Sequence, residues 1–211
     1  MTSKHIFFPC GDIQLEGELS LPEGKIPFPI VVICHPHPLY GGNMDNNVVM
    51  AISSAFLNQP IAVLRFNFRG VGNSGGKFNG GIGEQDDVKS ALDFVSKLPE
   101  IDRNRVGLAG YSFGGLMALS VAMGDDRVRQ LALVSPALNE KGWAQFKEYN
   151  LPKFVIVGDA DYMVPLQPFR YLFGNTKQYQ IIAGADHFWI GTELAVSEKI
   201  YRFFCDGFQN N

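Results

Sequence analysis

The chain has 211 residues, of which 46% are apolar and 18% charged, a balance typical of a compact globular protein and not of a disordered chain or a solenoid. Its 18 basic and 21 acidic residues leave a net charge of −3, which excludes the basic surface expected of a protein that binds nucleic acid or an anionic membrane. No run approaches the ~20 apolar residues of a membrane span, and the N-terminus lacks the apolar region of a secretory signal. We therefore expect a cytoplasmic protein, monomer or homodimer, that acts on a small molecule.

The cysteine content favours a reducing compartment. Cys10, Cys34 and Cys205 are odd in number and have no C-x-x-C spacing, which argues against a disulfide framework and against a zinc knuckle. No repeat, low-complexity tract or linker divides the chain, so a single domain over residues 1–211 is expected.

The N-terminal region predicts a hairpin and then a strand, a helix and a strand. Two β-like stretches flank residues 10–12, and the second alternates apolar and polar residues from Ile13 to Leu19, as in an antiparallel hairpin at a sheet edge. The continuous apolar run at 30–34 is typical of a strand covered on both faces. A helix over 45–59, capped by Asp45 or Asn46, and a strand over 61–66 follow.

A glycine-rich loop, RGVGNSGGKFNGGIG, comes next and invites comparison with phosphate-binding loops. It lacks the Lys-Ser/Thr pair of a P-loop and the third glycine of a dinucleotide fingerprint. We interpret it as a turn-rich connection to an amphipathic helix over 84–98, which Pro99 ends.

The segment 105–122, RVGLAGYSFGGLMALSVA, is the centre of the sequence. An apolar run meets Gly110-Tyr111-Ser112-Phe113-Gly114 and continues as a helix-like segment. G-x-S-x-G between a strand and a helix is the pattern of a nucleophile elbow, a sharp turn that presents the serine hydroxyl and the next backbone N–H to a substrate. Alone the pattern is weak, and a β–α turn with an incidental serine would match it equally well.

The remaining elements complete a parallel α/β pattern. We expect strands over 131–134, 153–157 and 178–182, an irregular or one-helix insert over 136–150, and helices over 166–173 and 190–208. Strands that alternate with helices predict a mostly parallel sheet wrapped on both sides. Ligands on such sheets lie at the carboxyl ends of the strands.

That rule locates partners for Ser112 in the loops after later strands. Asp159 and Asp161 follow one strand, and His187 follows the last one. A serine hydroxyl needs a base to accept its proton, and a histidine base needs an acid to orient and stabilise it. Either aspartate could serve, and the order serine, acid, histidine is that of α/β-hydrolases.

The whole chain resembles the α/β-hydrolase superfamily, with GYSFGG as the elbow, GDADYMVP as the acid loop and ADHFW as the histidine loop. The resemblance implies the α/β-hydrolase fold: a mostly parallel twisted sheet with an N-terminal antiparallel hairpin, helices on both faces and no lid domain. It also selects Asp161 as the acid, because the family's acid stands three residues after the glycine of its loop. Asp159 is then a turn former and Asp186 a solvated turn residue.

The loop after the strand at 30–34, HPHPLYGGNMDN, is similar to the H-G-x oxyanion loop of this family and resembles a group of small bacterial hydrolases. An oxyanion hole needs two backbone donors, of which Phe113 is expected to be one. Neither Pro36 nor Pro38 can donate. His37 is therefore the second candidate, with Leu39 or Tyr40 behind it.

A metal or cofactor is not expected. His35 and His37 form an H-x-H pair, but a catalytic zinc site generally needs three protein ligands and no third is evident. Cys34 lies in the apolar run and is interpreted as a buried small residue, although dienelactone hydrolases in the superfamily carry cysteine at the elbow.

The expected function is hydrolysis of small carboxylic esters through an acyl-enzyme on Ser112, with His187 as base and Asp161 as its orienting acid. Only about fifteen residues separate Pro136 from Lys153, too few for a lid domain, so an open site is expected. Thioesterase or small-peptidase activity would use the same three residues, and a non-catalytic binding module of the same fold is the alternative of another class. The expected substrate contacts are Leu39, Tyr40, Tyr111, Tyr162, Met163 and Phe188. Further aromatics in these loops either line the rim or pack in the core, and they are Trp143, Phe146, Tyr149 and Trp189.

Overall fold

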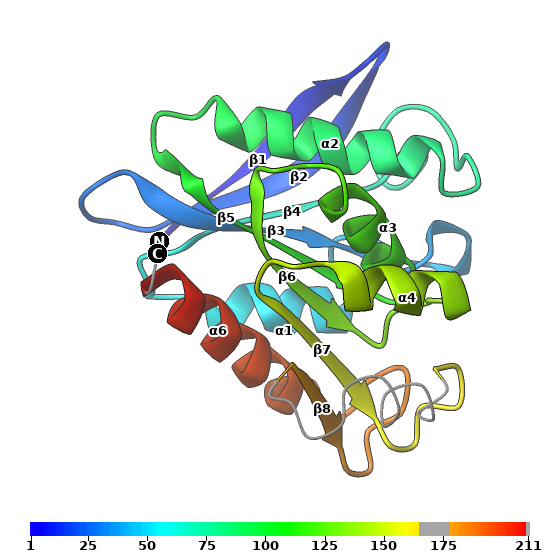
Figure 1. The fold of residues 1–211 in the computed structure, drawn as a ribbon. Coiled ribbons are helices and arrows are strands. Elements are labelled where there is room, and N and C mark those ends of the chain that lie inside the picture. Colours follow the sequence, from blue (N-terminus) through cyan, green and yellow to red (C-terminus); the bar gives the residue numbers. More distant parts are fainter. Residues whose placement is uncertain (165–177, 210–211) are drawn as a thin grey trace.

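The structure, a computed structural model, describes residues 1–164 and 178–209. Its centre is a sheet of eight strands in the order β1-β2-β4-β3-β5-β6-β7-β8 (Figure 1). The pairs β1–β2 and β2–β4 are antiparallel, and every other pair is parallel. The strands are β1 (Thr2–Cys10), β2 (Ile13–Leu21), β3 (Phe28–Cys34), β4 (Ala62–Phe66), β5 (Ile101–Tyr111), β6 (Val128–Val134), β7 (Lys153–Gly158) and β8 (Tyr179–Ile182). The predicted edge hairpin and parallel sheet are thus confirmed.

Helices cover both faces of the sheet. Figure 1 shows α2, α3 and α4 on one face and α1 and α6 on the other. The helices are α1 (Asn47–Ala55), α2 (Gly83–Ser96), α3 (Phe113–Ala122), α4 (Glu140–Glu148) and α6 (Glu193–Gln209). Of the two caps considered for α1, Asn46 is the one observed, since its side chain accepts from the backbone N–H of Val48 at 3.0 Å.

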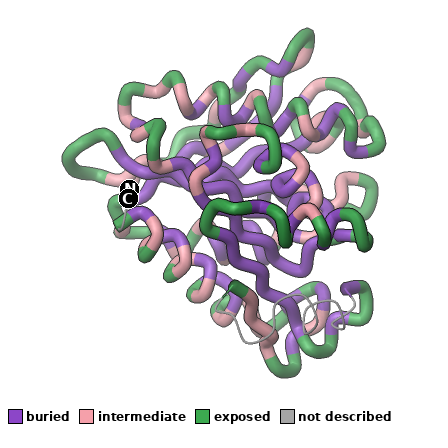
Figure 2. The backbone as a smooth tube through the Cα atoms, in the orientation of Figure 1, coloured by how far each residue is buried: buried purple, intermediate pink, exposed green. Residues whose placement is uncertain are grey.

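Two apolar cores result, one on each side of the sheet. Residues of β3 alternate between them: Ile30, Val32 and Cys34 face the α2–α3 side, and Val31 and Ile33 face the α1–α6 side. All seven residues of β3 are buried, as a strand covered on both faces requires. Figure 2 shows the same distribution, with a buried central sheet and exposed turns at the periphery.

The connection from β6 to β7 holds only α4, so no lid domain is inserted there. Helix α4 packs against α3, and it buries Trp143 and Phe146, with Tyr149 just after it. Of the two roles open to these three aromatics, rim or core, the structure shows the core, because their rings belong to the cluster on the α2–α3 side. The helix expected over 166–173 lies outside the described residues. Within the described chain, no helix has the length and apolar character needed to cross a membrane.

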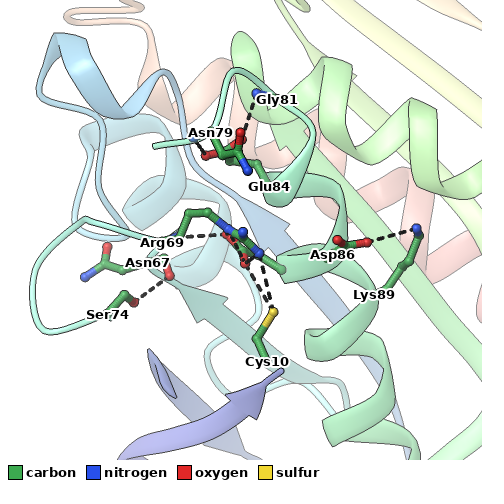
Figure 3. A network of polar contacts seen from close by, with 10 residues as sticks. Cys10, Asn67, Arg69, Ser74, Asn79, Gly81, Glu84, Asp86 and Lys89 are labelled. Carbon is green, nitrogen blue, oxygen red and sulfur yellow. Dashed lines mark hydrogen bonds and ion pairs between the residues drawn. The ribbon is translucent and has the colours of Figure 1, made fainter. Parts of the chain in front are cut away.

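The glycine-rich loop is held by buried carboxylates on α2 (Figure 3). Arg69 forms an ion pair with Asp87, which is fully buried, at 2.7 Å. Glu84, also fully buried, accepts from the backbone N–H groups of Asn79 and Gly81, each at 2.7 Å. These contacts turn a glycine-rich segment into a fixed connection, in agreement with its interpretation as a structural loop.

A third carboxylate, on β2, also holds this loop. Glu16 on β2 accepts hydrogen bonds from the backbone and side chain of Asn73, from Asn67 and from His5, at 2.7–2.8 Å. Burial alone would raise the pKa of Glu16, but the hydrogen bonds outweigh it and lower the pKa to about 2. The edge hairpin is thereby tied to the loop that follows β4.

Close backbone packing fixes helix α3 against the end of β3. A Cβ atom on Gly114 would lie 2.3 Å from the carbonyl oxygen of Cys34 and 2.5 Å from that of His35. Both neighbours are backbone atoms, which cannot move as a flexible side chain would. Only glycine at this position lets the helix approach the strand so closely.

We predict that Gly114→Ala lowers the free energy of unfolding by about 1–3 kcal/mol, because the added methyl group overpacks the contact between α3 and β3. Gly124→Ala is the matched control, since a Cβ there meets nothing within 4 Å. Urea unfolding of both variants measures the difference. Equal stability of the two variants would contradict this account of the contact.

We predict that Glu16→Gln lowers the free energy of unfolding by about 2 kcal/mol at pH 7, because charge-assisted hydrogen bonds are lost. The pKa of Glu16 is lower in the folded protein than its ordinary value of 4.5, so its stabilisation is complete above pH 4.5 and disappears as the pH falls toward 2. Unfolding curves between pH 7 and pH 2 should show the two proteins converging. Exposed Glu23→Gln serves as control, and a gap independent of pH would refute the assignment.

Candidate active site

Ser112 occupies a strained turn between β5 and α3. Strand β5 ends at Tyr111 and α3 begins at Phe113, so Ser112 alone makes the turn, with φ 53° and ψ −117°. A Cβ on Gly110 would meet the carbonyl oxygen of Gly114 at 2.3 Å, which explains the first glycine of the motif. Hydrogen bonds to Val134 and from Ala137 hold the backbone of Ser112. The strain is thus maintained by its surroundings, as at many functional sites.

The structure brings Ser112, His187 and Asp161 together. Nε2 of His187 lies 3.0 Å from Oγ of Ser112. Its other ring nitrogen, Nδ1, lies 3.1 and 3.0 Å from the two carboxylate oxygens of Asp161. His187 and Asp161 are both buried. This geometry allows His187 to accept the serine proton while Asp161 fixes the tautomer of the ring.

Hydrogen bonds to the Asp161 carboxylate favour its charged form. Its Oδ1 atom accepts from the backbone N–H groups of Met163 and Val164, each at 3.0 Å. Burial would raise its pKa, but hydrogen bonds from His187 and Ser135 outweigh burial, so the pKa lies below the ordinary value. Asp159, the other candidate acid, is exposed and accepts from the backbone N–H of Gly184 at 2.7 Å. It stabilises a turn and does not contact His187 within the described structure.

The loop that carries His187 is anchored by its own neighbours. Oδ1 of Asp186 accepts from the backbone N–H groups of Phe188 and Trp189 at 3.0 and 2.8 Å. Trp189 is fully buried and its indole N–H donates to Oγ of Ser135 at 3.1 Å. Both partners of this bond have positive φ, 60° for Trp189 and 39° for Ser135. Of the rim and core roles that the sequence left open, Trp189 therefore has the second, as a buried anchor of this loop.

The loop after β3 is ordered by its first histidine. His35 is fully buried, and its Nε2 accepts from the backbone N–H of Phe68 at 3.0 Å, so Nδ1 carries the proton and donates to the carbonyl of Pro36 at 2.6 Å. Burial lowers the pKa of His35 to about 4, against the raising effect of the Pro36 hydrogen bond. Both ring nitrogens are occupied, so the H-x-H pair does not present two free imidazoles to a metal. Among the described residues no group of three histidine, cysteine or acidic side chains could hold a metal ion.

His37 lies beside the elbow. Its ring centroid is 4.8 Å from that of Phe113 and 4.9 Å from that of Phe78, a residue of the glycine-rich loop. Its Nδ1 accepts from the backbone N–H of Leu39 at 3.2 Å, and burial lowers its pKa, so the ring is a neutral acceptor. In the described part of the chain, neither the backbone N–H of His37 nor that of Phe113 is donated to an acceptor. Both N–H groups are available to an oxyanion.

A pocket of about 390 Å³ opens over Ser112. Five of the six expected substrate residues line it, and Leu39, exposed on the neighbouring turn, does not. Among the described residues, the lining carries no Lys, Arg, Asp or Glu side chain. The lining consists of Pro36, His37, Tyr40, Gly41, Gly42, Asn46, Tyr111, Ser112, Tyr162, Met163, His187 and Phe188. The described lining therefore has no acidic or basic Asp, Glu, Lys or Arg side chain, and it combines Tyr, Phe and Met side chains with Ser112 and His187.

Three residues make contacts at the site that were not predicted from the sequence. Ser135 supports both Asp161 and Trp189, His35 joins two loops, and the hydroxyl of Tyr111 donates to the carbonyl of His187 at 2.7 Å. Ser135 directly follows β6, and the rule that ligands lie at the carboxyl ends of strands would have marked it. No sequence pattern indicates which residues His35 and Tyr111 would bond to.

Comparisons with known proteins agree with the geometry. The family model described as X-Pro dipeptidyl-peptidase (S15 family) matches residues 11–155. Protein RP471 of Rickettsia prowazekii is 35% identical over 173 residues, which cover 76% of this chain and 72% of that protein.

Two solved structures share the fold over almost their whole length. An α/β serine hydrolase homologue from Coxiella burnetii is 33% identical with a TM-score of 0.84, covering 96% of this chain and 97% of that one. XC6422 from Xanthomonas campestris, an α/β serine hydrolase without a lid, is 27% identical with a TM-score of 0.82, covering 98% and 95%. The chain therefore belongs to the S15 family of α/β-hydrolases, and it is an enzyme of the serine hydrolase type.

Proposed function

We propose that this protein hydrolyses small, uncharged carboxylic esters through an acyl-enzyme on Ser112. The observation that carries the proposal is the continuous contact from Ser112 through His187 to Asp161 at the base of an open pocket. Each member has a partner suited to one step of acyl transfer. A binding module of the same fold would have no need of this alignment.

In the first half of the reaction, Oγ of Ser112 attacks the ester carbonyl while Nε2 of His187 accepts its proton. The imidazolium that forms is stabilised by the adjacent carboxylate of Asp161. His187 then gives the proton to the departing alkoxide, and the alcohol leaves. In the second half a water molecule, deprotonated by His187, attacks the acyl-enzyme, and Ser112 recovers its proton as the acid departs.

The negative charge on the tetrahedral oxygen needs fixed donors. The backbone N–H of Phe113, at the start of α3, is one, and the positive end of the helix dipole adds to its effect. The backbone N–H of His37 is the second, and support for it comes from the position of His37 in the lining of the same pocket as Ser112. The packing of the His37 ring on Phe78 and Phe113 holds this loop in place.

The preference for uncharged substrates rests on the pocket lining. A dipeptidyl-peptidase must neutralise the terminal ammonium group of its substrate, and a buried charge without a partner is costly. The described lining holds no carboxylate, and Asp161, which contacts His187 of that lining, is already engaged by His187 and by backbone N–H groups. Aromatic and methionine side chains favour neutral apolar acyl groups. Thioesters satisfy the same requirements, so thioesterase activity is the second candidate.

We predict that the purified protein hydrolyses 4-nitrophenyl esters of short neutral acids, and that Ser112→Ala lowers kcat/KM by at least about 10³-fold because the nucleophile is lost. The experiment measures a panel of neutral esters, matched thioesters and X-Pro 4-nitroanilides with both proteins. X-Pro anilides should be hydrolysed far more slowly than the esters.

Ser120→Ala is the matched control, since Ser120 lies on the same helix and bonds only to the carbonyl of Leu116 in the described structure. It should retain activity. Ester hydrolysis by Ser112→Ala at the wild-type rate would refute the mechanism. Preference for thioesters or for X-Pro anilides would replace the ester assignment with one of the alternatives.

A further inference from the structure

Tyr111 was expected to contact substrate, but its hydroxyl has another partner. The side chain is 3% exposed, and its hydroxyl donates to the backbone carbonyl of His187 at 2.7 Å. The two rings lie 5.7 Å apart between centroids. The polar end of Tyr111 is thus occupied by the histidine loop.

This bond closes a ring that contains the reacting groups. Tyr111 and Ser112 are consecutive, and both bond to His187: Tyr111 through its hydroxyl to the carbonyl, and Ser112 through Oγ to Nε2. One residue of the histidine loop is therefore attached to the end of β5 at two points. Ser112 and Asp161 both contact the imidazole ring, whereas the bond from Tyr111 restrains the backbone of His187, from which the ring extends.

The hydroxyl of Tyr111 can act only as the donor in this hydrogen bond. Burial raises its pKa, and the charges of Asp161 and Asp186 raise it further, so the hydroxyl keeps its proton. A carbonyl oxygen can only accept, which fixes the direction of the bond. The ring itself is rigid because it packs in the core between the sheet and helices α1 and α6.

We propose that Tyr111 is a positioning residue that holds His187 in line with Ser112 by bonding its backbone carbonyl. The proposal rests on the proposed function, because it assumes that His187 removes the serine proton. It assigns to Tyr111 a role in the rate of the chemical step and not in substrate affinity. Preorganisation of this kind governs how often the reacting atoms meet in productive geometry.

The test uses inactivation by a fluorophosphonate, which does not depend on ester preference. Oγ of Ser112 forms a bond to phosphorus, the phosphorus–fluorine bond breaks, the serine proton passes to His187 and fluoride departs. Inactivation rates over a range of probe concentrations separate the maximal rate constant from the apparent affinity. Tyr111→Phe removes one oxygen and keeps the ring, so we expect a fall of about tenfold in the maximal rate constant with unchanged affinity.

Tyr149→Phe is the matched control. Tyr149 is 6% exposed, and its hydroxyl donates to the carbonyl of Val128 at 3.3 Å, at the end of β6 remote from Ser112. Thermal unfolding should show comparable losses of stability for both variants. Only Tyr111→Phe should slow inactivation.

A double-mutant cycle shows whether Tyr111 acts through His187. In the His187→Ala background, Tyr111→Phe should change the residual inactivation rate by less than about twofold, because no imidazole remains to be positioned. An undiminished rate in the single variant, a change confined to affinity, or a tenfold fall that persists without His187 would overturn the proposal. A wild-type protein that leaves the probe intact would instead overturn the proposed function.

Discussion

The active site depends on one constraint, the close approach of the backbone of helix α3 to the ends of β3 and β5. Because residues 110 and 114 are glycines, helix α3 can start directly after β5. A Cβ atom at either position would collide with backbone atoms of the neighbouring segment. This approach forces Ser112 into a conformation that residues with a side chain rarely adopt. The strained serine projects above the carboxyl edge of the sheet, where the loops of β6, β7 and β8 meet it.

The partners of Ser112 are held by backbone-directed hydrogen bonds that form a connected set. Asp161 is fixed by amides of its own loop, the His187 loop by Asp186, and the two loops are linked to β6 through Ser135 and Trp189. The positive φ angles of Ser135 and Trp189 are a local cost that these buried bonds offset. The loop after β3 is ordered by the hydrogen bonds of neutral His35 and by the packing of the His37 ring. This loop carries the backbone N–H of His37, which is available to an oxyanion.

Much of the fold and of the site could be predicted because the signals are local. The periodicity of the strands, the glycine spacing around Ser112, and the position of Asp161 and His187 directly after strands can be read from short segments. The contacts that could not be predicted join distant segments: Glu16 on β2 meets Asn73 in the loop after β4, and the carbonyl of His187 meets Tyr111. The burial of aromatics in loops could not be decided from the sequence either, since Trp189 fills the core although its neighbour Phe188 is half exposed.

The most direct measurement of the central claim is the detection of the acyl-enzyme. The protein is mixed with a 4-nitrophenyl ester, quenched in acid at short times, and examined by intact-mass and peptide mass spectrometry. The account predicts a mass increase equal to one acyl group, located on the peptide that contains Ser112. It should rise with the first release of nitrophenol and decay once the ester is consumed. Hydrolysis of the ester without acylation, or acylation of a different residue, would contradict it.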